Sequence, residues 1–300
     1  MKKSYIIVEL AGGLGNQIFL LEMAKYLASL NGSKVLVNLS HIDSKQFNGK
    51  STIEDLQFEK NIKLFRYNRI LKKLSDYSKK YLSIINKIKQ NIILVLDESE
   101  FTSGNNSLEK IVIARKPRLI IIFGFWQDFT YWQSEPKYVL KNPSQKYLDA
   151  CKLMKLQQPI VFHYRIGSYG TKWEYQWGIL SPDYLKNCLN YFNSDIKENT
   201  KVVWIFSDNP NNAQEFLRGV QMPKNFVISF FDDTNMSPAE IFMLISQSSY
   251  MICGNSTFSI AAARIGNVEN VIIPDALSKY GTVSMCIPNS WVGIKSVWLD

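Results

Sequence analysis

The chain has 300 residues, of which 46% are hydrophobic and 20% charged, and this balance excludes a disordered tail or a small disulfide-stapled domain. Its net charge of +9 favours an anionic partner, such as a nucleotide-sugar, a nucleic acid or an anionic membrane surface, without choosing among them. The four cysteines are widely spaced and form no CxxC pair, so neither a zinc site nor a thioredoxin-like motif is expected.

The first half of the chain predicts an α/β unit. Residues 5–10 form a strand, a glycine-rich turn follows, and a helix over residues 16–30 leads to a second strand over residues 34–39. A further apolar strand covers residues 119–123, and the polar stretch 141–145 is the candidate linker. This half is therefore expected to contain a βαβ-like unit at its start.

The second half repeats the alternation of strands and helices more clearly. Strands are expected over residues 159–162, 202–206, 226–230, 250–253 and 271–273. Helices are expected over residues 182–191 and 211–217, from a capping box at Ser237 onwards, and up to residue 265. This alternation implies right-handed crossovers and parallel sheets, so the chain predicts two Rossmann-like domains that face a cleft.

The N-terminal strand of residues 5–10 contains Glu9 and meets glycines at once, so it is too short for a signal peptide. No run approaches the roughly 18 apolar residues that a membrane-spanning helix needs. Together with the cysteine pattern, this predicts a cytoplasmic protein whose membrane role, if it has one, is peripheral at the inner face.

Basic residues recur between residues 60 and 90, among apolar residues at helical spacing, so one or two basic amphipathic helices are expected there as an insertion. A solvated helical face is one interpretation of this region, and a patch for peripheral association with a membrane is the other. Nucleic acid is not expected as a partner, because the region has no recognised recognition motif.

Residues 12–17, with the sequence GGLGNQ, are the first candidate site. Glycines allow a positive φ and a close approach of the backbone to a ligand, and the following helix offers free N–H groups. No third glycine completes GxGxxG and no acid ends the second strand, so a dinucleotide site is not indicated. The alternative is a tight strand–helix turn without a ligand.

The second candidate site follows the strand 159–162 and contains His163 and Arg165. Arginine binds phosphate oxygens bidentately and keeps its charge. A sugar nucleotide that reacts by displacement releases a nucleoside diphosphate, whose negative charge must be met. The alternative is a structural His–Arg pair at the end of a strand.

The third candidate site is residues 255–259, where small hydroxyl residues begin a helix. They either cap the helix or present hydroxyls and amides to a pyrophosphate. The chain has no Asp-x-Asp motif, through which many glycosyltransferases hold a cation, and Asp232-Asp233 is a weak substitute. We therefore expect no metal and no cofactor, with Arg165 and backbone dipoles neutralising the leaving group.

Five segments, taken in chain order, resemble motifs of the α-1,2-fucosyltransferases of glycosyltransferase family 11. Residues 12–19 resemble GGLGNQ followed by Ile or Met and Phe, 123–127 resemble GY(W/F)Q, 163–169 resemble HxRRGDY, 206–208 resemble FSDD, and 255–259 resemble NS(S/T)(F/Y)SWW. The matches span most of the chain, and five motifs in order are far less expected by coincidence than any one of them.

The resemblance implies a GT-B-like α/β fold of two Rossmann-like domains with parallel sheets facing a central cleft. Residues 1–145 would form the acceptor-side domain and residues 146–300 the domain that binds the GDP-sugar. The implied reaction is an inverting, metal-independent transfer of L-fucose from GDP-β-L-fucose to a sugar hydroxyl, in α-1,2 linkage to galactose. The implied context is O-antigen or capsule assembly, on a soluble or lipid-linked glycan acceptor.

By the same resemblance, Arg165 holds the diphosphate and His163 lines the site. The other substrate-binding residues that it implies are Gly13, Gly15, Asn16, Gln17, Asp208, Asn255, Ser256, Thr257 and Phe258. Inversion calls for a base near the acceptor hydroxyl, and Glu174 is the candidate. A loose oxocarbenium-like transition state without a strong base is the alternative.

The chain departs from the family pattern at three places. Ile166 stands at the second arginine, Ser168 at the aspartate, and Ile260-Ala261 at the tryptophan pair. The loss of one cation and one acid leaves a second hypothesis open, in which the same fold uses a different GDP-sugar donor or acceptor. A non-catalytic glycan-binding module is the third hypothesis.

Overall fold

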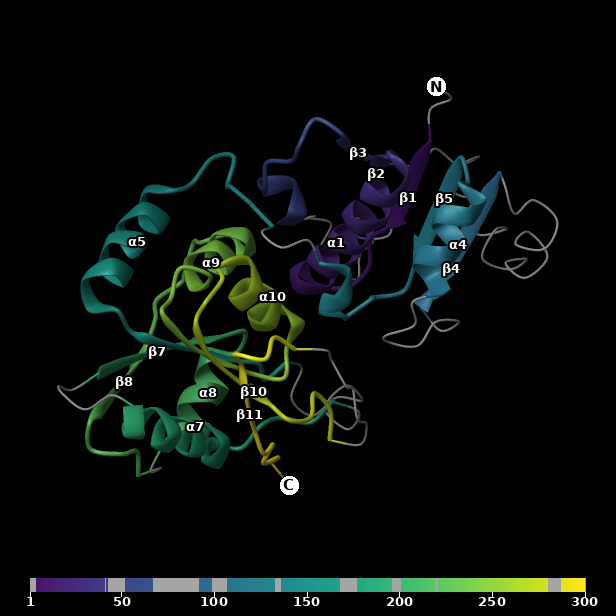
Figure 1. The fold of residues 1–300 in the computed structure, drawn as a ribbon. Helices are drawn as coiled ribbons and strands as arrows, with labels where there is room; N and C mark the ends of the chain where they lie inside the picture. Colours follow the sequence, from purple (N-terminus) through teal and green to yellow (C-terminus); the bar gives the residue numbers. More distant parts are fainter. Residues whose placement is uncertain are drawn as a thin grey trace. The chain divides into compact units, whose positions relative to one another are not determined.

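The computed structural model describes residues 4–40, 42, 52–66, 92–98, 107–132, 136–167, 177–195, 201–218, 221–279 and 287–299. The chain forms two compact units, Met1–Lys141 and Asn142–Asp300 (Figure 1). Each unit has its own parallel sheet and its own buried hydrophobic residues.

The described strands of the N-terminal unit form one parallel sheet in the order β3-β2-β1-β5-β4. They are β1 (Tyr5–Glu9), β2 (Lys34–Asn38), β3 (Ile62–Phe65), β4 (Ile93–Asp97) and β5 (Leu119–Phe123). The helices are α1 (Leu14–Asn31) and α4 (Ser107–Arg115), which pack on each other, with the 3-10 helices η2 (Thr52–Asp55) and η4 (Phe129–Tyr131). Strands β1 and β5 lie next to each other although they are far apart in the chain, and ligands of open parallel sheets bind outside the carboxyl ends of the strands.

The described strands of the C-terminal unit form a second parallel sheet, in the order β8-β7-β6-β9-β10-β11. They are β6 (Ile160–Tyr164), β7 (Lys201–Ser207), β8 (Phe226–Phe230), β9 (Tyr250–Cys253), β10 (Asn270–Pro274) and β11 (Val292–Ile294). Counted along the chain within this unit, the order is third, second, first, fourth, fifth, sixth, which is the order of dinucleotide-binding Rossmann folds. The switch point lies between β6 and β9.

Helices cover both faces of the C-terminal sheet. They are α5 (Gln145–Gln157), α7 (Pro182–Asp195), α8 (Pro210–Leu217), α9 (Pro238–Ile245) and α10 (Thr257–Ile265). In Figure 1, α9 and α10 lie on one side of the sheet, and α7 and α8 lie on the other. All five residues of β6 are buried, which explains why this strand is a continuous apolar run up to His163.

The strand register brings three loops of the C-terminal unit together. His163 of β6 lies beside Phe206 of β7 on one side and beside Cys253 of β9 on the other. The residues that directly follow these strands therefore meet at one edge of the sheet. This is the edge at which Rossmann-like sheets bind their ligands.

Most expected elements are confirmed: strands β1, β2, β5, β6, β7, β8, β9 and β10, and helices α1, α7, α8, α9 and α10. The elements β4, α4, α5 and β11 have no counterpart among the expectations. Helix α5 begins inside the stretch 141–145, where Ser144 caps it by accepting the N–H of Tyr147. Only Ala150 and Met154 of α5 are buried, so its amphipathic pattern is weak.

Residues 62–65 correct the expectation of helix throughout residues 60–90. Ile62–Phe65 is strand β3, which pairs with β2 and places Ile62 beside Val35. Apolar and basic side chains alternate with period two at Ile62, Lys63 and Leu64, and the helical spacing of the wider region concealed this short pattern. Residues 67–91, which hold the rest of the expected basic helices, lie outside the described residues.

In the part of the chain that the structure describes, no helix combines the length and the hydropathy needed to cross a membrane.

Gly266, which ends α10, tests the packing of α10 on α9. A Cβ atom at Gly266 would overlap with the backbone carbonyl of Ser246, which follows α9 and cannot swing away. We expect Gly266→Ala to lower the free energy of unfolding by roughly 2–3 kcal/mol in urea denaturation. The control is Gly293→Ala in β11, where a Cβ would meet nothing within 4 Å. Equal losses in the two variants would contradict this account of the packing.

Candidate functional site

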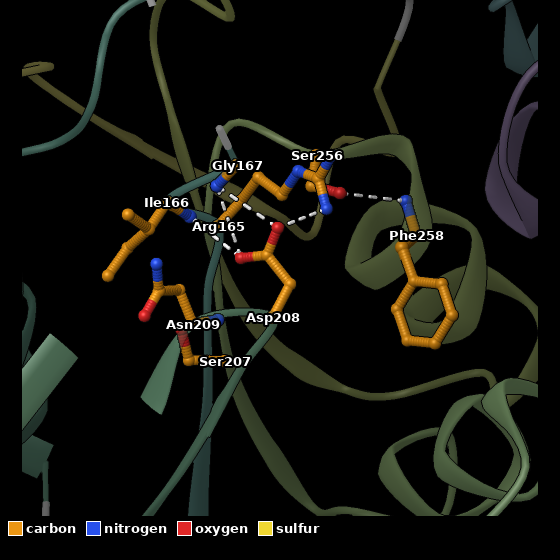
Figure 2. A network of polar contacts seen from close by, with 8 residues as sticks. All are labelled: Arg165, Ile166, Gly167, Ser207, Asp208, Asn209, Ser256 and Phe258. Atoms are coloured by element: carbon orange, nitrogen blue, oxygen red, sulfur yellow. Dashed lines mark hydrogen bonds and ion pairs between the residues drawn. The ribbon is translucent and has the colours of Figure 1, made fainter. Parts of the chain in front are cut away.

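The carboxylate of Asp208, which follows β7, holds the segment that follows β6. Its Oδ1 atom accepts the N–H of Ile166 at 2.9 Å, and its Oδ2 atom accepts the N–H of Gly167 at 3.0 Å. The same Oδ2 forms an ion pair with Nη1 of Arg165 (Figure 2). One acid thus fixes both the backbone of the neighbouring loop and the side chain of its arginine.

The guanidinium of Arg165 is held without being buried. Its side chain is 51% exposed, while that of Asp208 is 26% exposed. A guanidinium carries five N–H donors, and Asp208 is bonded to Nη1, so further donors are accessible to an anion. The φ angle of Gly167 is +67°, a value that glycine adopts without strain, and the loop turns there.

Ile166 belongs to the hydrophobic core rather than to the polar site. Its side chain is 3% exposed and packs in the same buried cluster as Phe162 and Leu185. The position at which the family-11 pattern has a second arginine therefore contributes packing in this chain. Only its backbone N–H, bonded to Asp208, contributes to the polar network.

His163 is buried beside this network. Its side chain is 7% exposed, and its ring stacks on Phe258 with the ring centroids 5.0 Å apart. Burial is the main cause that lowers the pKa of His163 from 6.5 to about 4, while Asp208 opposes the shift and Arg165 adds to it. The imidazole is therefore neutral near pH 7, and its Nδ1 atom has no hydrogen-bond partner in the part of the chain that the structure describes.

The N-terminus of α10 reaches the same edge of the sheet. Ser256 caps the helix, and its hydroxyl accepts the N–H of Phe258 at 3.3 Å (Figure 2). Asn255 donates to the carbonyl oxygen of Gly178 at 3.0 Å, while its own buried Oδ1 has no partner among the residues with described positions. Thr257 is the first residue of the helix, whose N-terminal N–H groups and dipole favour an anion.

Gly254 allows α10 to begin so close to β6. A Cβ atom there would overlap with the carbonyl oxygen of His163 and would lie 3.4 Å from the backbone nitrogen of Arg165. Arg165 and the start of α10 are therefore neighbours. A cation and a helix N-terminus together form an electropositive site for phosphate groups.

The glycine-rich loop joins the carboxyl end of β1 to α1 in the N-terminal unit. Gly12 has φ +72°, Gly13 occupies the N-cap position of α1, and Gly15 is buried in its first turn. Asn16 and Gln17 are the two amides that follow. This half of the candidate site therefore has the tight glycine turn that its sequence indicates.

The amides of this loop are held from two directions. Gln17 is 2% exposed and donates to the carbonyl oxygen of Gly12 at 2.9 Å, but its buried Oε1 has no partner within the described part of the chain. Oδ1 of Asn16 accepts a hydrogen bond from Gln127, which follows β5, at 2.9 Å. Unsatisfied buried acceptors are costly, and in a native fold they call for an explanation such as a function or a bound ligand.

Sequence reasoning missed three residues that shape these two edges. Gln127 lies in a segment that the family resemblance includes, so its place after β5 was the available signal. The hydroxyl of Tyr184 donates to the carbonyl oxygen of Cys253 at 3.0 Å, and Glu98 accepts the N–H of Phe125 at 2.7 Å. Neither has a signal in the sequence, because both contacts join residues far apart in the chain.

Of the predicted site residues, Glu174 lies outside the described residues, as does Ser168, which stands at the family's aspartate. Among the residues that are described, no group of three or more His, Cys, Asp or Glu side chains could hold a metal ion. Asp232, weighed above as a metal handle, pairs with Lys146 at 2.8 Å and accepts the N–H of Thr234. Metal independence stays a prediction.

No family model matches the chain, and no curated protein sequence matches it. Among solved structures, the chain is similar to a mutant of FUT1 from Arabidopsis thaliana in complex with GDP, with 13% identity and a TM-score of 0.53 over 90% of this chain and 70% of that one. It is similar to the NodZ alpha-1,6-fucosyltransferase soaked with GDP-fucose, with 13% identity and a TM-score of 0.52 over 91% and 96% of the two chains. It is also similar to fucosyltransferase NodZ from Bradyrhizobium, with 12% identity and a TM-score of 0.50 over 87% of this chain and 92% of that one.

At these identities the likeness shows the fold alone. With two parallel-sheet α/β domains, the fold is GT-B-like, as expected from the sequence.

The depressed pKa of His163 makes the stability of the chain depend on pH. The unfolded chain binds a proton near pH 6.5 that the folded chain binds only near pH 4, so this stabilisation is complete above pH 6.5 and is lost as the pH falls. Between about pH 7 and pH 5, we expect the wild type to lose about 2 kcal/mol more unfolding free energy than His163→Gln. Urea denaturation at both pH values measures this, and equal losses in the two proteins would contradict it.

Proposed function

We propose that the chain is a glycosyltransferase that transfers L-fucose from GDP-β-L-fucose to a sugar hydroxyl. The observation that carries the proposal is the placement of Arg165, fixed by Asp208, next to the N-terminus of α10 at the switch point of a Rossmann-like sheet. Transfer of a sugar from its nucleotide leaves a diphosphate, and this edge offers fixed positive charge and helix N–H groups for it.

The proposed roles follow the geometry of the C-terminal unit. Arg165 binds the diphosphate, and Asp208 keeps its guanidinium and the loop backbone in place. The hydroxyls of Ser256 and Thr257 and the first turn of α10 face the phosphates. Such positioning needs no rearrangement during the reaction, and this is what makes an electrostatic site effective.

His163 has a different proposed role. Because its pKa is about 4, it carries no charge near neutral pH and does not compete with Arg165 for the phosphates. It supports the ring of Phe258, on which it stacks, and with Asn255 it lines the pocket. The general base stays open between Glu174 and a reaction through a loose oxocarbenium-like transition state.

The N-terminal unit takes the acceptor in this proposal. Gly13 and Gly15 shape the loop, and Asn16 and Gln17 supply amides to sugar hydroxyls. The linkage rests on the sequence resemblance, which favours α-1,2 transfer to galactose, whereas the NodZ structure is named an alpha-1,6-fucosyltransferase. The same proposal includes inversion at the transferred sugar and the acceptor named above. It also includes a cytoplasmic role in O-antigen or capsule assembly and a peripheral membrane contact through residues 60–90.

One observation favours a second candidate, a transferase with a different GDP-sugar donor or acceptor. The side chain of Ile166 is committed to the core, so the loop has one arginine where the family-11 pattern has two. A site with fewer charges would hold the diphosphate less tightly and would depend more on contacts with the sugar. A panel of GDP-fucose, GDP-mannose and UDP-sugars in thermal-shift measurements separates the two candidates.

The role of Arg165 is tested by the change Arg165→Lys. Lysine keeps the positive charge and loses the planar fork that binds two oxygens, so we expect the affinity for GDP to fall about 10- to 100-fold. Isothermal titration calorimetry measures the affinity. Arg218→Lys, at the end of α8, is the matched control and should bind GDP like the wild type. If the wild type, Arg165→Lys and Arg218→Lys bind GDP with similar affinity, Arg165 does not bind the diphosphate.

The reaction itself is tested by incubating the chain with GDP-fucose and a panel of galactosides. We expect GDP release that depends on the acceptor and is the same in the presence of a chelator, because Arg165 and α10 rather than a cation would stabilise the leaving group. Mass spectrometry and NMR of the product give the sugar and the linkage. If no GDP-sugar is turned over, the proposed transferase activity is wrong. If turnover is lost on chelation, the proposed metal independence is wrong.

A further inference from the structure

The turn after β5 exposes one aromatic ring at the carboxyl edge of the N-terminal sheet. Phe125 is 41% exposed, whereas the next residue, Trp126, is 3% exposed. Strand β5 lies beside β1, with Ile122 next to Val8, so residues 124–127 lie at the same edge of the sheet as residues 10–13. The ring of Phe125 is therefore presented where ligands of such sheets bind.

The backbone around Phe125 is in an unusual and firmly held conformation. Gly124 has φ +102° and Trp126 has φ +49°, which is rare for an aromatic residue. A Cβ atom at Gly124 would lie 2.5 Å from Cβ of Glu98, so only glycine fits there. Backbone strain of this kind persists where the surroundings over-determine it, and it gathers at ligand sites.

Hydrogen bonds hold the turn on both sides of the ring. Oε2 of Glu98 accepts the N–H of Phe125 at 2.7 Å, and the indole N–H of Trp126 donates to the carbonyl oxygen of Phe123 at 2.6 Å. Gln127 donates to Oδ1 of Asn16 at 2.9 Å, which joins the turn to the glycine-rich loop. The backbone that carries the exposed ring is therefore firmly held. The carboxylate of Glu98 and the amides of Gln127 and Asn16 lie on either side of this turn.

A pyranose ring matches this arrangement. One face of a β-galactoside carries C–H groups with slight positive charge, and such a face stacks on the electron-rich face of an aromatic ring. Its hydroxyls at the rim need hydrogen-bonding partners, and the carboxylate of Glu98 lies beside the ring, where its Oε2 accepts the N–H of Phe125. A rigid aromatic ring surrounded by a few polar groups is how small-molecule sites combine affinity with orientation.

We infer that Phe125 is the stacking platform for the acceptor sugar, held in position by Glu98 and the strained turn at Gly124 and Trp126. This inference rests on the proposed function and deepens it, because it assigns the acceptor site to one ring and one class of ligand, a pyranoside with an apolar face. The guanine base of GDP could also stack on an aromatic ring, so the test includes GDP as a second probe.

The test measures the binding of methyl β-D-galactopyranoside and of GDP to the full chain by saturation-transfer NMR and calorimetry. We expect Phe125→Ala to weaken galactoside binding about tenfold, Phe125→Tyr to keep it because the aromatic face remains, and GDP affinity to stay the same in both. The matched control is Tyr191→Ala on α7, an aromatic residue with the same exposed fraction of 41%. This control should bind both probes like the wild type.

Three results would overturn the inference: galactoside binding that survives Phe125→Ala, a loss of GDP affinity in that variant, or no saturation transfer from the wild type to the galactoside. The two proposals fail separately. If GDP binds and the galactoside does not, the platform is wrong and the donor site stands. If the galactoside binds through Phe125 and GDP does not bind, the platform stands and the proposed function is wrong.

Discussion

The carboxylate of Asp208 is the contact on which the arrangement of the C-terminal site depends. It bonds to two backbone N–H groups of the loop after β6 and to the guanidinium of Arg165, so three donors converge on one acid. Without it, the loop would lose its hydrogen-bond partners and the arginine would be one mobile surface cation. In the proposed function, a diphosphate at this edge would meet a guanidinium whose position is already set, and this would lower the entropy lost on binding.

Topology explains why these groups meet. Parallel strands end at a common edge, and the reversal of strand order opens a place between β6 and β9 that no crossover helix covers. Gly254 lets α10 start against the end of β6, and Gly12 serves the corresponding turn after β1. Buried polar atoms that have no partner among the described residues lie at both edges, on Gln17 in one unit and on His163 and Asn255 in the other. Their unmet hydrogen bonds are a physical reason to expect ligands there.

The sequence predicted the alternating elements because their signals are local. An apolar run such as that of β6, the capping box at Ser237 and the glycine stop of α10 each act within a few residues. The strand at Ile62–Phe65 was missed because three alternating residues in a four-residue strand are a short signal beside a long helical pattern. Helix α5 was missed because most of its surface is polar or exposed and only two of its residues are buried.

The sequence could predict which residues make up the candidate site, but not the contacts that hold them in place. His163 lies near the end of β6, and Arg165 and the segment from Asn255 follow strands, so their convergence could be predicted once the strands were assigned. The clamp by Asp208 was not, because it joins residues more than 40 positions apart and depends on the register of β6 and β7. Nor could the sequence tell that Ile166 turns into the core while its N–H faces the acid.

The most direct test of the account is a crystal structure of the chain with GDP. The account predicts diphosphate oxygens within hydrogen-bonding distance of the Arg165 guanidinium and of the first turn of α10, with Asp208 still bonded to the N–H groups of Ile166 and Gly167. A diphosphate bound away from both Arg165 and α10, or held there by a metal ion, would contradict it.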